Sequence, residues 1–559
     1  MHKTMDETLA RRVALRRVED GTAVPEPRLV EYAGHNAFAS DPVLTASLDA
    51  ALDDETEDEF RDLGAYWGSV EAQEVARIAV QNRPTLRHLD DEGQRIDQVE
   101  MHPAYHALMN RSVSTGLLSS AWEDGEGNRQ HRLRAALLMM TAGCERGHLT
   151  PMAATHAAIA ALAYAQDLEA ELFPLLASRR YDRRALPLEE KDGATVTFAI
   201  DERELTGERA ALRTRGELST GDKIRITGEK AFVLAPGSDL FLVLARTVDG
   251  PAAAIVPRFS LENAGAVFID ATSDAGGLGA QAAATVRFQE ARGRIVGEPG
   301  RGLQVLRDVR TLSQLDATVI AAGGARAALA RATHHLRTRV RAGTPLIADP
   351  LNARVIADMA LTSASLTALS LRLATAFDQA FERDGDHAVA RIATPAARVH
   401  ALKAAIHLTE EARETLGTTA LSASHPVSRI GPDLAVIARW DGLASDAAHD
   451  LVHIVARDED VLADALEELG ADLGNANADL IERVSSLGRE ATQNPGLARA
   501  FAEQLAMVTA ASAMRRNLPR VVSDAYIASR LRGGYAGLYG TLDARFDAAA
   551  LIDFIVPED

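Results

Sequence analysis

A block of about 100 residues, roughly 193–295, constrains the fold of this chain more than any other feature. Runs such as ATVTFAID, DKIRITGEKAFVL and AAATVRFQEA are short, rich in β-branched residues and separated by Gly, Pro and Asp, a pattern typical of strands. On both sides of the block, apolar residues recur at a spacing of three to four, which indicates amphipathic helices. The sequence therefore predicts a mainly α protein with a β-domain insert.

The changes of pattern divide the chain into five expected parts. They are an N-terminal arm (1–45), an N-terminal helical domain (46–190), a middle β-barrel or sandwich domain (191–296), a helical bundle domain (297–456) and a C-terminal helical extension (457–559). Long alanine-rich segments in the fourth part suit close packing as an antiparallel bundle. Helices, then a β domain, then a bundle is an uncommon order.

Charge and composition narrow the classes of partner. The net charge is −19, and the C-terminal extension carries ten arginines, no lysine and seventeen acidic residues, a net charge of −7. Phosphate binding depends on basic surface, and base stacking depends on aromatic side chains, which make up only 4% of the chain. We therefore expect neither nucleic acid nor an anionic membrane as a partner.

Cysteine usage and hydropathy indicate the compartment. Cys144 is the single cysteine, which excludes an internal disulfide and a cysteine-based metal site. The N-terminus lacks an apolar signal region, and charged residues interrupt the apolar stretches before they reach about 18 residues. These observations predict no membrane span and a cytoplasmic protein.

The segment IARWDGLASDAAHDLVHIV (437–455) contains the residues most suggestive of chemistry. Asp441 precedes a helix, where aspartate is a favoured N-cap, but a carboxylate in a cavity also suits acid–base work. Arg439 is placed to pair with it, to bind an anionic substrate group or to face solvent. His449 and His453 share a helix face at the spacing of metal ligands, but no third ligand is apparent, so we expect no metal.

Several motifs and their order resemble the acyl-CoA dehydrogenase family, and within it the AidB-like branch. They include MHPAYHALM (101–109), VPRF (256–259), VGEPGRGLQVL (296–306) and the spacing from ETLG (414–417) to RWDG. The resemblance implies an N-terminal helical domain, a β domain, a C-terminal four-helix bundle and extra C-terminal helices. It also implies a homodimer or homotetramer assembled through the bundle.

The resemblance also implies roles for individual residues. Asp441 stands where the family has a glutamate that removes the proton α to a thioester carbonyl, with Trp440 and Gly442 beside it. These two neighbours and Arg439 are expected to bind substrate. His156 falls among the family's cavity-lining residues and is a second catalytic candidate. Arg339 matches an arginine that reaches the cofactor of a neighbouring subunit.

Side chains that hold flavin in the family are replaced here. The replacements are Asp201, Gly207 and Glu208 in the first loop, Ala231 and Leu234 in the next strand, Ala342 after the arginine, and residues 443–445 after the catalytic acid. A carboxylate facing the electron-rich edge of a flavin is unfavourable without a compensating donor. We therefore expect no cofactor, with FAD as the alternative.

Three functions follow from these expectations. The first is a non-redox enzyme that uses Asp441 for acid–base or shape-controlled chemistry on a hydrophobic acyl or polyketide-like substrate. Cyclisation, isomerisation and elimination are examples, and secondary metabolism is one setting for them. The alternative is an FAD-dependent oxidoreductase of the acyl-CoA dehydrogenase type. The second alternative is a non-catalytic, AidB-like binding protein.

Overall fold

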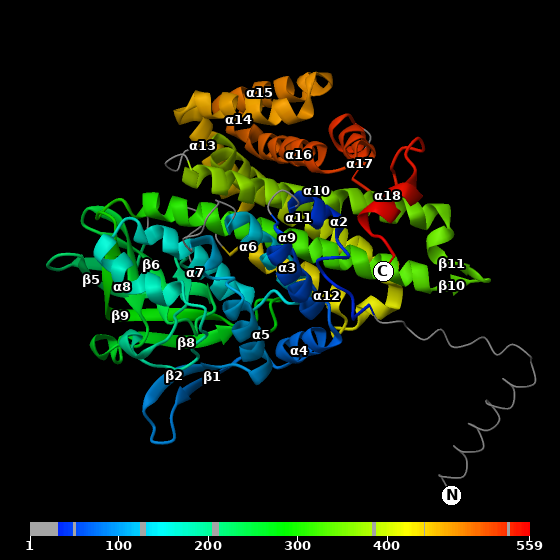
Figure 1. Cartoon of the computed structure of the whole chain (residues 1–559). Helices are drawn as coiled ribbons and strands as arrows, with labels where there is room; N and C mark the ends of the chain where they lie inside the picture. Colours follow the sequence, from blue (N-terminus) through cyan, green and yellow to red (C-terminus); the bar gives the residue numbers. More distant parts are fainter. Residues whose placement is uncertain are drawn as a thin grey trace, which may run out of the picture.

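A computed structural model of the 559-residue chain describes residues 32–48, 52–122, 130–203, 212–382, 387–440, 442–533 and 537–558. The β domain lies at one end, and three long helices run away from it through the middle of the molecule (Figure 1). The C-terminal helices lie across these long helices. The fold class expected from the sequence, mainly α with a β-domain insert, is confirmed.

The N-terminal part is helical apart from one hairpin. Its helices are α2 (Pro42–Leu48), α3 (Asp54–Trp67), α4 (Val70–Gln81), α5 (Pro103–Ser114), α6 (Gln130–Cys144), α7 (Leu149–Leu162) and α8 (Gln166–Leu176). Strands β1 (Thr85–Leu89) and β2 (Arg95–Glu100) pair antiparallel between α4 and α5. The sequence reasoning missed this hairpin because each strand is short and half exposed, and only the turn residues DDEG marked it.

The β domain closes into a small barrel. Its strands are β3 (Val196–Ala199), β4 (Arg215–Leu218), β5 (Lys223–Leu234), β6 (Leu240–Thr247), β7 (Gly250–Pro257), β8 (Val267–Ser273) and β9 (Ala283–Val296). The order β6-β4-β5-β9-β7 returns to β6, because β6 also pairs with β7. Strand β3 runs parallel to β6 at the rim that faces the helices. Closure leaves this ring without a free edge.

The bundle consists of α9 (Gly302–Thr338), α10 (Pro350–Glu382), α11 (Ala388–Leu416) and α12 (Pro426–Ile437), followed by α13 (Ala444–Arg457). A short hairpin, β10 (Val340–Arg341) and β11 (Thr344–Pro345), joins the first two helices. Small residues let the helices approach closely. A β-carbon added at Gly323 of α9 would lie 2.3 Å from the carbonyl oxygen of Met139 on α6.

Helix α10 contradicts the expectation that no segment is long and apolar enough to cross a membrane. The stretch Pro350–Ala380 meets both criteria, but 94% of its most apolar window is buried inside the protein. The helix packs against α9, α11 and α16, which explains its composition. Such burial is typical of a core helix, and the cytoplasmic location stays a prediction.

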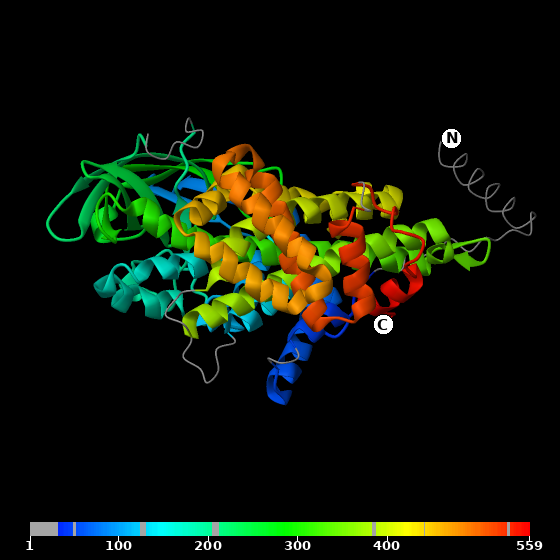
Figure 2. The ribbon, with the colours of Figure 1, turned by 90° about the horizontal axis from the view of Figure 1, so that it is seen from above.

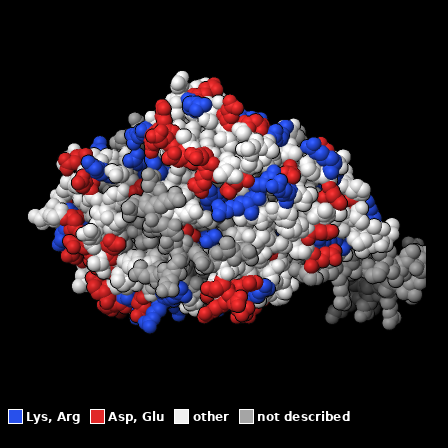
Figure 3. Space-filling model, turned by 45° about the horizontal axis from the view of Figure 1, so that its top comes forward, with Lys and Arg blue, Asp and Glu red and all other residues white. Residues whose placement is uncertain are grey.

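The C-terminal extension covers one face of the bundle. It comprises α14 (Glu459–Leu473), α15 (Ala478–Gln493), α16 (Ala498–Asn517), α17 (Arg520–Tyr526) with a π-helical turn (Ile527–Leu531), and α18 (Ala548–Ile555). Helix α16 packs on both α10 and α11, as the two ribbon views show (Figure 2). Acidic and basic side chains are intermixed over this face, and a patch of basic side chains lies near its centre (Figure 3).

Candidate functional site

The loop between α12 and α13 holds four of the residues singled out from the sequence, Arg439 to Gly442. Trp440 is buried, and its ring stacks on Phe198 of β3 with centroids 5.7 Å apart and planes 21° apart. Gly442 adopts φ +123°, a conformation that side chains other than glycine rarely allow. Asp441 lies outside the described residues, so its role stays a prediction.

Arg398 of α11 holds this loop, and the sequence reasoning did not find it. Its Nη2 donates to the carbonyl oxygens of Ala438 (3.0 Å) and Gly442 (2.6 Å), which flank the Arg-Trp-Asp segment. The side chain is only 1% exposed. Buried guanidinium groups need carbonyl or carboxylate acceptors, and here the loop backbone supplies them. The loop is therefore clamped by Arg398 and anchored by the stacked Trp440.

The two predicted arginines lie apart. Arg439 is exposed, and its Nη1 donates to the Ala435 carbonyl oxygen (2.5 Å). Arg339 follows the last residue of α9, and its side chain makes no ion pair among the described residues. Its role toward the cofactor of a neighbouring subunit and the oligomeric state both stay predictions.

His156 belongs to a buried polar cluster on three helices. Its Nδ1 lies 3.0 Å from Asp316 Oδ2 on α9, and Arg134 of α6 donates two hydrogen bonds to the same carboxylate (2.6 and 2.9 Å). All three side chains are buried. Burial would raise the pKa of Asp316, but Arg134 and His156 outweigh it and lower that pKa to about 2. The carboxylate is therefore ionised inside the helical core.

The imidazole of His156 is neutral at physiological pH. Burial, followed by the charge of Arg134, lowers its pKa below the ordinary value. With Nδ1–H donating to Asp316, Nε2 is a buried acceptor that no described group satisfies. The rings of Trp122 and His131 lie 5.6 and 5.7 Å from it, centroid to centroid. An oriented, neutral imidazole with a free acceptor can take up a proton.

Strand β3 connects this cluster to the loop. Thr155, the neighbour of His156 on α7, accepts the backbone N–H of Val196 at the start of β3 (2.9 Å). Phe198, two residues later, carries the Trp440 ring. Side chains from the N-terminal domain, the β domain and the bundle therefore meet along one short strand.

An arginine-rich pocket of about 160 Å³ lies between α9, α11 and α13. Its lining includes Arg307, Arg310, Arg391, Arg457 and His453. The Arg310 side chain is buried, and only its Nη1 is paired, with Asp450 (2.8 Å). Its Nε and Nη2 are buried and satisfied by no described group. This geometry suits an anion of more than one charge, which would supply the missing acceptors.

Sequence reasoning missed this pocket, although a signal was present. Arg307 and Arg310 are one helical turn apart directly after the glycine-rich turn at 297–302. His453, weighed earlier as a metal ligand, faces the pocket instead. Among the described ranges, no group of three or more His, Cys, Asp or Glu residues could hold a metal ion.

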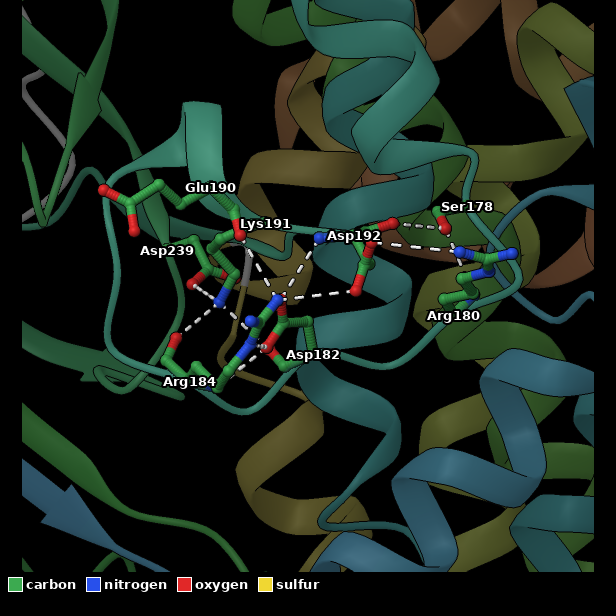
Figure 4. Close-up of polar contacts among 8 residues, drawn as sticks. All are labelled: Ser178, Arg180, Asp182, Arg184, Glu190, Lys191, Asp192 and Asp239. Carbon is green, nitrogen blue, oxygen red and sulfur yellow. Dashed lines mark hydrogen bonds and ion pairs between the residues drawn. The ribbon is translucent and has the colours of Figure 1, made fainter.

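A second polar cluster joins the helical and β domains in the segment that precedes β3 (Figure 4). Lys191 Nζ donates to Asp239 Oδ1 (2.6 Å) and to the carbonyl oxygens of Asp182 (3.0 Å) and Arg184 (2.7 Å). Arg184 in turn makes two hydrogen bonds to Asp182 (2.9 and 2.6 Å). These contacts tie the segment between α8 and β3 to Asp239, directly before β6.

A buried ion pair occupies the part of the β domain that the resemblance assigns to flavin. Lys230 Nζ donates to Glu202 Oε1 (3.0 Å) and to the Ile200 carbonyl oxygen (2.9 Å). Burial would raise the pKa of Glu202, but hydrogen bonds from Thr214 and Arg213 and the charge of Lys230 lower it to about 2. These groups stabilise the barrel rim and are not free to bind a cofactor.

Another group in the same region does fit a flavin. Phe232 of β5 is 44% exposed, in the strand that the resemblance assigns to flavin binding. The backbone beside it is paired internally, since the Asp201 carbonyl oxygen accepts the backbone N–H of Ala231 (2.9 Å). A planar ring can pack on an exposed aromatic face. Gly207 and Glu208 lie outside the described residues.

Two known protein families match this chain, one in the N-terminal helical region and one in the bundle. The family described as "Adaptive response protein AidB N-terminal domain" matches residues 28–183, and "Acyl-CoA dehydrogenase, C-terminal domain" matches residues 300–445. The "Putative acyl-CoA dehydrogenase AidB" of Escherichia coli is 30% identical over 473 residues, covering 82% of this chain and 86% of that protein.

Two solved structures share the fold. Caenorhabditis elegans ACDH-11 in complex with C11-CoA has a TM-score of 0.79 at 18% identity, covering 97% of this chain and 94% of that one. An acyl-CoA dehydrogenase complexed with FAD from Bacillus anthracis has a TM-score of 0.61 at 14% identity, covering 90% and 87%.

The FAD in the Bacillus structure contradicts the expectation of no cofactor. The expectation failed because a flavin site also uses backbone groups and ring faces, which survive the loss of several motif side chains. The E. coli relative spans most of both chains, and the two family matches lie where the motifs predicted them. The chain belongs to the acyl-CoA dehydrogenase family and to its AidB-like branch.

Proposed function

We propose that this chain is an FAD-dependent acyl-CoA dehydrogenase-type enzyme that forms a Cα–Cβ double bond in an acyl-CoA thioester. Family membership supports the reaction class, and the C11-CoA in the C. elegans structure supports an acyl-CoA substrate. The observation that carries the proposal is the arginine-rich pocket beside the loop, because coenzyme A has phosphate groups that match it.

Phosphate binding in this pocket would satisfy Arg310. Its buried Nε and Nη2 point to an acceptor from outside the described chain, and Arg307 and Arg457 add charge around it, whereas Arg391 is paired with Asp458 (2.9 Å). Helix α13 lines the pocket with Asp450 and begins at Ala444, directly after the loop. At 1.5 Å per residue, this stretch spans about 9 Å, a distance that the arm between the phosphates and the thioester easily bridges.

The loop residues would then act on the thioester end. The carboxylate of Asp441 takes the proton from Cα, and a base must lie within hydrogen-bond reach of that proton. Arg398 and the Trp440–Phe198 stack hold the loop so that this geometry is set before substrate arrives. Trp440, Gly442 and Arg439 form the surrounding contacts.

His156 is proposed as a second proton-handling group. Its imidazole is oriented by Asp316 and retains a free Nε2 acceptor in a dry core. A neutral imidazole that is fixed by a carboxylate accepts a proton more readily than one in an apolar core alone. Loss of His156 should therefore lower kcat without changing the binding of the coenzyme A phosphates.

FAD would bind against Phe232, with Arg339 contributed by a neighbouring subunit. When bound, it supplies the acceptor for the hydride that leaves Cβ. The chain's own contribution is to exclude water, hold the acyl chain and remove the proton.

Anaerobic mixing of the purified protein with decanoyl-CoA tests this function. Bleaching of the visible flavin absorbance is the expected result, and Asp441→Asn should abolish it. The acid–base alternatives, cyclisation and isomerisation, instead predict Cα proton exchange with solvent deuterium and no bleaching. A purified protein that contains no flavin, and takes none up, would refute the proposal.

Arg310→Gln tests the substrate site. Loss of charge-assisted hydrogen bonds worth about 1.5–3 kcal/mol should lower kcat/KM by roughly 10- to 100-fold, mainly through KM. Arg301→Gln is the matched control, because Arg301 is exposed and pairs only with Glu298 (3.0 Å). Equal kinetic effects of the two substitutions would remove the pocket from the proposal.

A further inference from the structure

A large cavity lies between the bundle and the C-terminal extension, lined by Val399, the neighbour in sequence of the Arg398 that holds the catalytic loop. Its volume is about 580 Å³, within the roughly 300–1,000 Å³ typical of small-molecule sites. It lies where α16 and α17 cross α10 and α11 (Figure 2). Neither the sequence motifs nor the proposed reaction uses it.

Most of the surface exposed inside this cavity is apolar, although polar and charged side chains also line it. Val399 and Ala404 of α11 and Met507 of α16 line it together with Tyr526 and Tyr539. Both tyrosines are buried, and the Tyr539 ring stacks on His407 with centroids 4.8 Å apart. Apolar surface in so large a hollow favours a bound apolar chain over water.

The charged groups around the cavity are predominantly cationic. Lys403 and Arg499 line it, and neither makes an ion pair with any described residue. Glu503 lines the same wall but pairs with neither. Burial lowers the pKa of Lys403, and the nearby charges of Arg499, Arg398 and Arg439 lower it further. This is the direction expected where positive charges lie close together. An anionic group would neutralise this cluster.

Buried polar contacts fix one side of the cavity. Arg530 forms an ion pair with Asp358, which is fully buried, and also donates to Thr362 Oγ1 (3.2 Å). Asp358 accepts the backbone N–H of Gly540 (3.0 Å) as well. The Nη2 of Arg530 is engaged by Asp358, so the ligand's charge is assigned to Lys403 and Arg499, which make no ion pair with any described residue, and its tail is directed toward the tyrosines.

We propose that this cavity is a second binding site, distinct from the acyl-CoA site, for an amphipathic anion with an apolar chain and a single carboxylate head, such as a medium-chain fatty acid. Lys403 and Arg499 bind the carboxylate, and Val399, Met507 and Tyr539 contact the chain. The site depends on the C-terminal extension, since α16, α17 and the segment that follows supply half of its wall.

Isothermal titration of the full-length protein with sodium decanoate tests this site. We expect one decanoate per chain that the Lys403→Gln, Arg499→Gln double variant binds at least tenfold more weakly. Filling the cavity with Ala404→Phe should also abolish this binding. Arg310→Gln, in the proposed acyl-CoA pocket, should leave it unchanged, as should Arg489→Gln, an exposed arginine of α15 without an ion pair among the described residues.

The remaining outcomes overturn the proposal. Absence of decanoate binding, or binding that the double variant leaves intact, would do so. Equal affinity for decyltrimethylammonium would refute the anionic head. Loss of binding in Arg310→Gln would assign the ligand to the acyl-CoA pocket. A dimer that dissociates in the double variant would assign the cavity to a second copy of the chain.

Discussion

Replacing Asp316 with asparagine should strongly destabilise the protein. The carboxylate accepts two hydrogen bonds from Arg134 and lies 3.0 Å from His156 Nδ1, and no part of the cluster is open to water. An amide cannot neutralise Arg134. Breaking a buried pair by removing one partner typically costs about 3–5 kcal/mol, because the remaining charge stays buried.

The measurement is the free energy of unfolding of Asp316→Asn from urea denaturation at pH 7. Glu217→Gln is the matched control, because Glu217 pairs with Arg225 at 2.9 Å on the surface, where both side chains are about half exposed or more. Exposed pairs contribute about 0–1 kcal/mol. A loss for Asp316→Asn no larger than that of the control would refute the buried-pair reasoning.

The same residue predicts a dependence on pH. The pKa of Asp316 falls from 3.8 to about 2 on folding, so its contribution is present above pH ~4 and is lost as pH falls toward the folded pKa. A shift of nearly two units corresponds to about 2 kcal/mol. The difference in stability between the native protein and Asp316→Asn should therefore shrink between about pH 4 and 2. A difference that stays constant over that range would contradict this linkage.

Three further predictions concern packing and the loop. Gly323→Ala should lose about 1–3 kcal/mol of stability through overpacking against α6, whereas Gly143→Ala, whose added β-carbon meets neighbours at 3.6 Å, should be neutral or slightly stabilising in the same thermal melts. Burial raises the pKa of the Cys144 thiol to about 11. A thiol reagent at pH 8 should therefore modify Cys144 only when the protein unfolds, and rapid labelling of the native protein would contradict this burial. Arg398→Met removes the donor of two loop carbonyls and should lower stability by about 2–5 kcal/mol and kcat by at least tenfold; normal turnover would show that the clamp is not needed.

The sequence by itself determined the fold class, because periodicity is a local property. Strand and helix patterns located the β domain between residues 193 and 295 and the helices around it, and the spacing of short motifs identified the family. It also marked the Trp-Asp-Gly loop. It failed for the β1–β2 hairpin, whose short, half-exposed strands carry little pattern.

The tertiary structure decided which charges are buried together and which surfaces are left open. Asp316, Arg134 and His156 are separated by up to 182 residues in sequence, and only the packing of α6, α7 and α9 shows that they form one cluster. Arg398 and Arg310 looked like ordinary helix residues in a chain rich in arginine. What each side chain binds depends on the carbonyl and carboxylate groups, and the pockets, that the neighbouring helices place beside it. Contacts between distant segments are set by packing, which no local sequence pattern encodes.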